Sequence, residues 1–246
     1  MGRFFKVLYI ISLTLLAIIF IFTLKLEDLG AIMKKTYPLS VFSGIIFFLF
    51  FFLPFIALAE TALEKGIKEF QEENYEEALI FFQDARKTDP KSTTAAFYLG
   101  LTYKILEDPA SAIPHLRDAV SYTPRIKEAL VELIDVLIQT DRFEEAKKWI
   151  EVAEKEQISP ARVQFLKGIG LLKENKNDEA IVAFEKAKEL DKTLTQAADF
   201  QIANAYMRLG MLKESKKRFQ SLITIDPKSD LAGYARDYEK AITDKL

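Results

Sequence analysis

The sequence predicts an all-α fold: an α-solenoid of about five helix–turn–helix repeats, followed by a capping helix and preceded by one or two hydrophobic helices. Three observations predict this fold. A small residue recurs every 34 residues, a bulky residue follows it four positions later in each copy, and the first 59 residues contain two long uncharged runs. A period of 34 residues is typical of repeats that are built from two short helices.

The recurring residues keep one phase along the chain. The small residue stands at Ala78, Ala112, Ala146 and Ala180, and a step of 35 then leads to Ser215, so one residue is inserted around Thr195. The bulky residue stands at Phe82, Leu116, Ile150, Phe184 and Phe219. A glycine precedes the pair at Gly66, Gly100 and Gly168, with Ile134 and Ala203 in its place in the third and fifth copies. Small residues let two helices cross closely, and bulky ones fill the remaining space.

The second copy shows the pattern most completely. Between Ala95 and Pro124 it reads Leu99-Gly100-x-x-Tyr103, then Ala112, Leu116, Ala119 and the closing Pro124. This order resembles the bacterial tetratricopeptide-repeat (TPR) family, whose pattern is L-G-x-x-Y, A-x-x-x-F and a final proline. The resemblance runs from about Ala59 to Ser229 and implies a right-handed solenoid. Its copies are expected at about 59–92, 93–126, 127–160, 161–194 and 196–229, within a repeat domain of residues 60–229.

Residues 230–246 are expected to form a capping helix. Apolar side chains at helical spacing predict the packed face of this helix, and they are Leu231, Tyr234, Ala235, Tyr238, Ala241 and Ile242. Charged residues between them predict a solvated opposite face, which a solenoid needs where its stacking ends.

Residues 1–59 are predicted to be a membrane region. The uncharged runs cover residues 7–24 and 39–59, and each is close to the roughly 20 residues that cross a bilayer as a helix. The second run also ends in Ala57-Leu58-Ala59, which has the form of a signal-peptidase site. Residues 33–59 are therefore either a retained membrane helix or a cleaved signal sequence. In the second case residues 1–32 are either an over-extended start of the chain or a true additional helix, so their place in the mature chain stays open.

The basic residues near these runs predict the topology. Lys25, Lys34 and Lys35 lie between the two runs, and only Arg3 and Lys6 precede the first. Because basic loops stay in the cytoplasm, the repeats are expected on the extracytoplasmic, periplasmic side. The alternative with cytoplasmic repeats differs by few charges and stays open. The chain has no cysteine, which excludes a lipid anchor of the bacterial lipoprotein kind.

The sequence offers no catalytic, cofactor-binding or metal-binding residues, so we expect no enzyme and no cofactor. It contains neither a nucleotide-binding glycine loop nor an H-E-x-x-H or G-x-S-x-G motif. His115 is the only histidine and has no second ligand at metal-binding spacing, which favours a packing role. Residues 60–246 carry 29 Lys and Arg against 34 Asp and Glu, a net charge of −5. This mixed, slightly acidic surface argues against binding to nucleic acid.

The resemblance also implies a candidate binding groove. In this family the first helices line the concave surface through their second, fifth, ninth and twelfth positions. In this sequence those positions are Leu63, Ile67, Phe70, Phe97, Leu101, Lys104, Val131, Asp135, Ile138, Phe165, Ile169, Leu172, Phe200, Asn204 and Met207. We call these residues the predicted groove row. Family members that bind the carboxylate ends of heat-shock chaperones have Lys at the fifth position and Asn at the ninth, and the row lacks that Lys.

The function predicted from these features is a membrane-tethered scaffold. It would bind a protein or peptide partner through the largely apolar groove row, in envelope assembly or in the organisation of a complex. The alternative to this groove is a narrow strip whose side chains pack against one another. Two other functions remain open at this stage: a secreted soluble adaptor after cleavage at Ala59, or a structural spacer subunit of a membrane complex.

Overall fold

The computed structural model describes residues 60–122 and 126–244. The predicted helices at 7–24 and 39–59 lie outside the described residues, as does the predicted cleavage site after Ala59. In the part of the chain that is described, no helix is long and apolar enough to cross a membrane.

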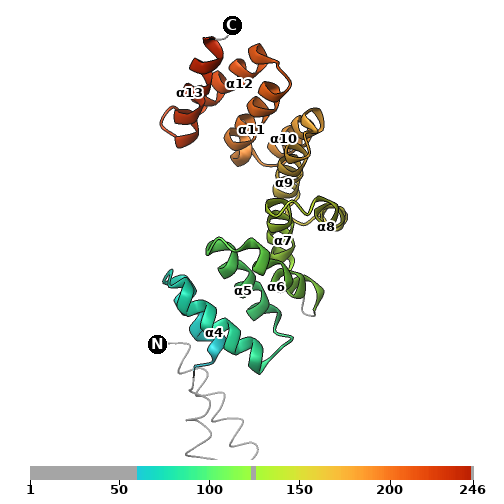
Figure 1. The fold of residues 1–246 in the computed structure, drawn as a ribbon, viewed down its shortest axis with the longest axis vertical. Helices are drawn as coiled ribbons and strands as arrows, with labels where there is room; N and C mark the ends of the chain where they lie inside the picture. The colour runs from blue at the N-terminus through green and yellow to red at the C-terminus, as the bar shows by residue number, and fades with distance from the viewer. Residues whose placement is uncertain (1–59, 123–125, 245–246) are drawn as a thin grey trace, which may run out of the picture. The chain divides into compact units, whose positions relative to one another are not determined.

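Eleven α-helices and one short 3₁₀ helix make up the regular structure of the described residues, which include no strand. The helices are α3 (Ala62–Gln71), α4 (Tyr75–Thr88), α5 (Thr93–Ile105), α6 (Pro109–Ser121), α7 (Lys127–Gln139), α8 (Phe143–Lys155), α9 (Pro160–Lys173), α10 (Asn177–Leu190), η1 (Lys192–Leu194), α11 (Thr195–Arg208), α12 (Leu212–Ile225) and α13 (Asp230–Thr243). Each helix packs against the next one along the chain, and each odd-numbered helix also contacts the next odd-numbered helix (Figure 1). This is an all-helical solenoid, as the sequence predicts.

Side-chain caps mark where several helices begin. Thr61 and Glu64 form a reciprocal capping box before α3, in which each side chain accepts a hydrogen bond from the other's backbone N–H. Ser92, Asp108 and Ser229 cap α5, α6 and α13 by accepting a hydrogen bond from a backbone N–H three residues later. Such caps satisfy N–H groups that have no partner within the helix.

A residue with positive φ lies in the middle of each three-residue turn between the two helices of a repeat. These residues are Glu73, Glu107, Asp141, Asn175 and Gly210, with φ between 58° and 74°. Along the chain, successive residues of this set are 34, 34, 34 and 35 positions apart, which is the spacing of the repeats. Only the last is glycine, the residue that adopts this conformation without steric cost. The tight turn therefore recurs in every copy although its usual sequence signal occurs only once.

The two helices of a repeat cross most closely at the glycine of the pattern. A Cβ atom added to Gly66 would lie 2.7 Å from the ring of Phe82, and one added to Gly168 would lie 2.6 Å from the ring of Phe184. Both phenylalanines are fully buried. The absence of a side chain at these positions lets the bulky residue of the second helix pack directly on the first helix.

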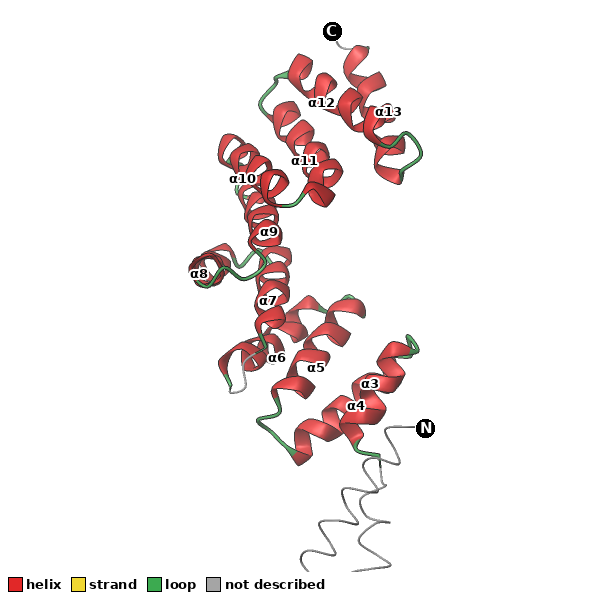
Figure 2. Cartoon of the chain, turned by 180° about the vertical axis from the view of Figure 1, so that it is seen from behind, coloured by secondary structure: helices red, strands yellow, loops and turns green. Residues whose placement is uncertain are grey.

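The third repeat cannot form this close crossing. Ile134, fully buried in α7, occupies the position that is glycine in the first, second and fourth repeats. The second helix of the repeat, α8, packs less closely on α7 than the corresponding helices pack in the other repeats, and less closely on α9 than α4 packs on α5. Figures 1 and 2 show α8 to the side of α7 and α9. The side chain of Ile134 thus accounts for the outward position of α8.

The fourth and fifth repeats are joined by an ion cluster around one buried aspartate. Asp199 in α11 is 3% exposed and accepts hydrogen bonds from Lys188 of α10 and from Arg218 of α12, the latter at 3.0 Å. Arg218 also pairs with Glu185 at 2.5 Å. The residue inserted around Thr195 is accommodated by η1, where the Asp191 side chain accepts a hydrogen bond from the backbone N–H of Thr193 at 2.9 Å.

The predicted packed face of α13 is only partly correct. Ala235 and Ile242 are buried, Leu231 is half-buried, and Tyr238, although 39% exposed, lies flat on Phe219 of α12 with ring centroids 5.3 Å apart. Tyr234, however, is 60% exposed, and Ala241 is exposed too. The buried stripe also includes Ala232, so it follows the spacing 232, 235 and 242. At 100° per residue, Tyr234 and Ala241 lie beyond that stripe and Tyr238 lies at its edge, which explains their different exposure.

We expect Gly100→Ala to lower the free energy of unfolding by ~1–3 kcal/mol, as overpacking does. The new Cβ would lie 2.5 Å from Cγ of Leu116 and 3.3 Å from its backbone nitrogen, so the two helices must move apart. Gly233 in α13 is a matched control, because a Cβ atom added there would have no atom within 4 Å. Gly233→Ala should raise stability by ~0.5–1 kcal/mol. Chemical denaturation followed by circular dichroism measures the change in the free energy of unfolding for both variants. Equal changes in the two variants would contradict the close crossing at Gly100.

Candidate functional site

The predicted groove row lies on the first helices of the five repeats, which are α3, α5, α7, α9 and α11. Each of these helices contacts the next one in the series, so their corresponding positions follow one another along the stack. The row thereby brings together residues from five segments that are each about 34 residues apart in the sequence. Whether this row binds a partner stays a prediction.

The apolar members of the row are less exposed than an open binding surface would be. Val131, Ile138 and Leu172 are buried, and the other members are half-buried. Phe165 packs edge-on against Phe184, with ring centroids 5.3 Å apart. The half-buried members of the row therefore contribute to the core with one side of their side chains and offer the other side to solvent, whereas the three buried members belong to the core.

Charged residues occupy the centre of the row. Lys104 of α5 donates to Asp135 and, at 2.7 Å, to Glu132, both on α7. Arg162 of α9 approaches Glu132 from the other side at 2.7 Å. Burial lowers the pKa of Lys104, but the hydrogen bonds and charges of Asp135 and Glu132 outweigh it and raise this pKa above its ordinary value. The lysine stays charged and ties the second repeat to the third.

The sequence prediction includes Lys104 and Asp135 but misses Glu132 and Arg162. Glu132 lies outside the row positions of α7, and Arg162 stands at the second position of α9, which the residues listed for the row do not include. The long side chains of both reach across to the neighbouring repeat. The only sequence signal for this network is the alternation of acidic and basic residues on successive first helices. That pattern cannot be distinguished from an ordinary solvated face without the stacking geometry.

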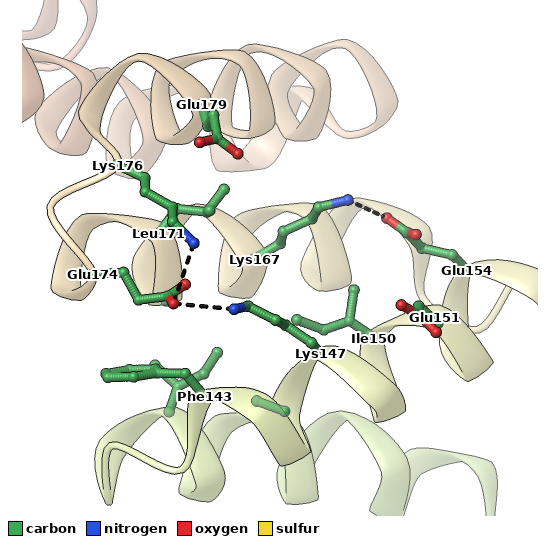
Figure 3. Close-up of a pocket in the computed structure, with 13 residues that line it drawn as sticks. Phe143, Lys147, Ile150, Glu151, Glu154, Lys167, Leu171, Glu174, Lys176 and Glu179 are labelled. Carbon is green, nitrogen blue, oxygen red and sulfur yellow. Dashed lines mark hydrogen bonds and ion pairs between the residues drawn. The ribbon is translucent and has the colours of Figure 1, made fainter.

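A second concave feature shares only one residue, Ile138, with the row. A cavity of about 220 Å³ separates α8 from the α9–α10 pair, and we call it the α8–α9 pocket (Figure 3). Its apolar lining consists of Ile138, Phe143, Ala146, Ile150, Gly170 and Leu171. Its charged rim consists of Lys147, Glu151, Glu154, Lys167, Glu174, Lys176 and Glu179. The sequence prediction does not include this pocket, because the pocket depends on the outward position of α8.

Ion pairs connect part of this rim. Glu174 pairs with Lys147 at 3.0 Å and with Lys176 at 3.3 Å, and Glu154 pairs with Lys167 at 3.0 Å. Burial raises the pKa of Glu174, but its hydrogen bonds to the two lysines outweigh this effect and lower the pKa overall. The paired carboxylates therefore stay ionised at neutral pH.

The described residues contain no group of three or more His, Cys, Asp and Glu side chains that could hold a metal ion. His115 lies flat on Tyr103, with ring centroids 5.4 Å apart and an angle of 4° between the rings. This stack gives the only histidine of the chain a packing role within the second repeat.

Comparisons with known proteins agree with the repeat architecture. Residues 197–229 match the family described as tetratricopeptide repeat, and residues 100–207 match the TT21 fifth ARM repeats domain. The TPR repeat-containing protein YsoA of Bacillus subtilis (strain 168) is 32% identical over 117 residues, which cover 44% of this chain. The chain matches about a third of that protein's length, 33%.

Solved structures share the fold. The thermophilic TPR protein TTC0263 of Thermus thermophilus is similar over 72% of this chain and 96% of its own, at a TM-score of 0.57 and 21% identity. YrrB, described as a TPR protein with an unusual peptide-binding site, is similar over 72% of this chain and 90% of its own, at a TM-score of 0.57 and 20% identity. The described helices have the tetratricopeptide-repeat fold. TPR folds are typically non-enzymatic scaffolds that bind peptides or proteins.

The environment of His115 generates a prediction about pH. Burial and the nearby charge of Arg86 lower the pKa of His115 below its ordinary value of 6.5, against the opposing effect of Asp118. As the pH falls, the unfolded chain therefore takes up this proton before the folded chain does. We expect neutral His115 to make its full contribution to the free energy of unfolding above pH 6.5. This contribution should be lost progressively as the pH falls from there towards the pKa of His115 in the folded state.

His115→Phe is the matched variant, since it keeps an aromatic ring on Tyr103 and removes the titration. Urea denaturation of both proteins between about pH 5 and pH 7.5 gives the difference between their unfolding free energies at each pH. This difference should change across the range as the unmodified protein loses stability. A constant difference would show that the folded state does not disfavour protonation of His115.

Proposed function

We propose that this chain is a non-enzymatic scaffold that binds a segment of a partner protein along its first helices. The observation that carries the proposal is the contact of each first helix with the next, which places the groove row along one stack. A surface of this kind can hold an extended or helical segment over several repeats, as in helix-in-groove recognition. The peptide-binding site named for YrrB supports this function by analogy.

The composition of the row suggests an amphipathic partner. Phe97, Phe165 and Phe200 lie at the same position of three repeats and are half-buried, so each retains an accessible apolar side. The Lys104–Asp135 pair adds a polar centre. A partner segment with apolar residues at intervals and polar residues between them would complement both parts.

The proposal includes membrane tethering through residues 1–59, with the repeats on the extracytoplasmic side. It rests on the two uncharged runs and on the basic residues between them. In this arrangement the repeats would collect partners at the membrane, in envelope assembly or in the organisation of a complex. The alternatives are a secreted adaptor, which the mass of the mature chain distinguishes below, and a structural spacer, which normal capture by the row variant would favour.

We expect Phe97→Ser with Phe165→Ser to abolish partner capture, because buried aromatic anchors at interfaces typically contribute ~2 kcal/mol or more each. Capture is measured by crosslinking in intact membranes, followed by purification and mass spectrometry. Ile80→Ser with Val182→Ser is the matched control. These two apolar residues are 58% and 70% exposed on the second helices, so the control removes apolar surface away from the row.

The helical content of both variants is measured with the capture experiment. Lost capture with unchanged helicity in the row variant, and normal capture in the control, would support the groove. Normal capture by the row variant would exclude the groove row as the binding site. A collapse of helicity in the row variant alone would show that these aromatics serve the core.

The topology can be tested separately. Alkaline phosphatase fused after Leu246 should be active, because it folds correctly only outside the cytoplasm, whereas the same enzyme fused after Lys35 should be inactive. The opposite result would overturn the proposed orientation. The mass of the mature chain then separates tethering from secretion, because cleavage after Ala59 would leave Glu60 as the first residue.

A further inference from the structure

The α8–α9 pocket lies where a contact that is made between α4 and α5 is missing. Between α4 and α5, the side-chain amide of Gln83 donates a hydrogen bond to the hydroxyl of Tyr103 at 3.2 Å. Leu171 and Glu151 lie two repeat lengths, 68 residues, after Tyr103 and Gln83. Leucine is shorter than tyrosine and has no hydroxyl, so the same contact cannot form between α8 and α9.

Two departures from the repeat pattern therefore meet at this pocket. Ile134 holds α8 away from α7, and Leu171 leaves unfilled the position that Tyr103 and Tyr206 fill in the second and fifth repeats. Phe143 and Ile150 of α8 and Leu171 of α9 line the resulting apolar cavity (Figure 3). A cavity of about 220 Å³ can accept one large apolar side chain.

The rim of the pocket carries uncompensated negative charge. Its three lysines, Lys147, Lys167 and Lys176, are all engaged in ion pairs with Glu174 or Glu154. Glu151 and Glu179 are exposed, and no ion pair or hydrogen bond to another described residue is found for either carboxylate. These two carboxylates are free to pair with cations of a bound molecule.

We propose that the α8–α9 pocket is a second binding site, for a protein segment that carries a Leu- or Phe-sized side chain beside Lys or Arg. The apolar side chain fills the cavity between α8 and α9, where it replaces the missing tyrosine. The basic residues pair with Glu151 and Glu179 at the rim. Complementary charge of this kind selects the partner, and the buried apolar side chain supplies most of the affinity. This site shares only Ile138 with the groove row, and that side chain is 2% exposed, so a scaffold could hold two segments at once.

The probe is a fluorescein-labelled peptide of twelve residues with a central Leu-Phe pair and Lys on both sides. Two matched peptides replace either the lysines with glutamate or the Leu-Phe pair with serine. Fluorescence anisotropy measures their binding to the full-length chain in phosphatidylcholine nanodiscs, with protein-free nanodiscs as the blank. We expect the basic apolar peptide to bind at least tenfold more tightly than either matched peptide.

The decisive variant is Leu171→Tyr, which restores the residue found at this position in two other repeats. It should fill the cavity, keep the helical content and weaken binding of the basic peptide about tenfold or more. Glu151→Lys with Glu179→Lys should reverse the preference, so that the glutamate peptide binds better than the lysine peptide. These two residues are exposed, so this second variant remains informative if Leu171→Tyr perturbs folding.

Several results would overturn the proposal: no binding of the basic peptide to the unmodified chain, unchanged binding by both variants, or equal binding of all three peptides. The Phe97→Ser, Phe165→Ser variant separates this site from the groove row. It should bind the basic peptide normally. If it alone loses binding, the peptide occupies the row and the α8–α9 pocket is not the site.

Discussion

The close crossing of the two helices within a repeat is the contact on which the rest of this solenoid depends. At Gly66, Gly100 and Gly168 there is no room for a Cβ atom beside the bulky residue of the second helix. Because the bulky residue packs on bare backbone, the distance between the helices is short. The fifth repeat forms its helix crossing without a glycine. There Ala203 faces Ser215, whose hydroxyl donates a hydrogen bond to the Ala203 carbonyl at 2.9 Å. A buried hydroxyl is thereby satisfied within the crossing itself.

Where the glycine of the close helix crossing is missing, in the third repeat, a pocket opens at the surface. Ile134 replaces the glycine of the third repeat, α8 moves outward, and the α8–α9 pocket appears next to it. One apolar substitution within the core thus has its main consequence at the surface. Since neighbouring repeats stack directly on one another, a change in one helix pair alters the joint with the next pair.

Polar contacts between repeats complement the apolar core. Lys104 links the second repeat to the third, and the Asp199 cluster links the fourth to the fifth. Near the ends of the first helices, Lys173 donates to the carbonyl oxygen of Ile138 at 2.9 Å and Arg208 to that of Leu172 at 2.6 Å. Each of these carbonyl oxygens also accepts a hydrogen bond from a backbone N–H of the following turn, that of Asp141 or Asn175, so the basic residues add a second hydrogen bond at the helix end. The interactions are directional, so they favour one stacking of the repeats over others that would bury similar apolar area.

The sequence alone determined the repeat length, the pairing of helices and the all-α class, because the contacts that define a repeat lie within 34 residues of one another. It did not reveal the positive φ at Glu73 and Glu107, since glutamate carries no signal for that conformation. It also could not show that Val131, Ile138 and Leu172 of the groove row are buried, or that Glu132 and Arg162 meet beside it. Those features depend on how one repeat stacks on the next. Periodicity identifies the face of a helix, but only the tertiary structure decides how far that face is covered.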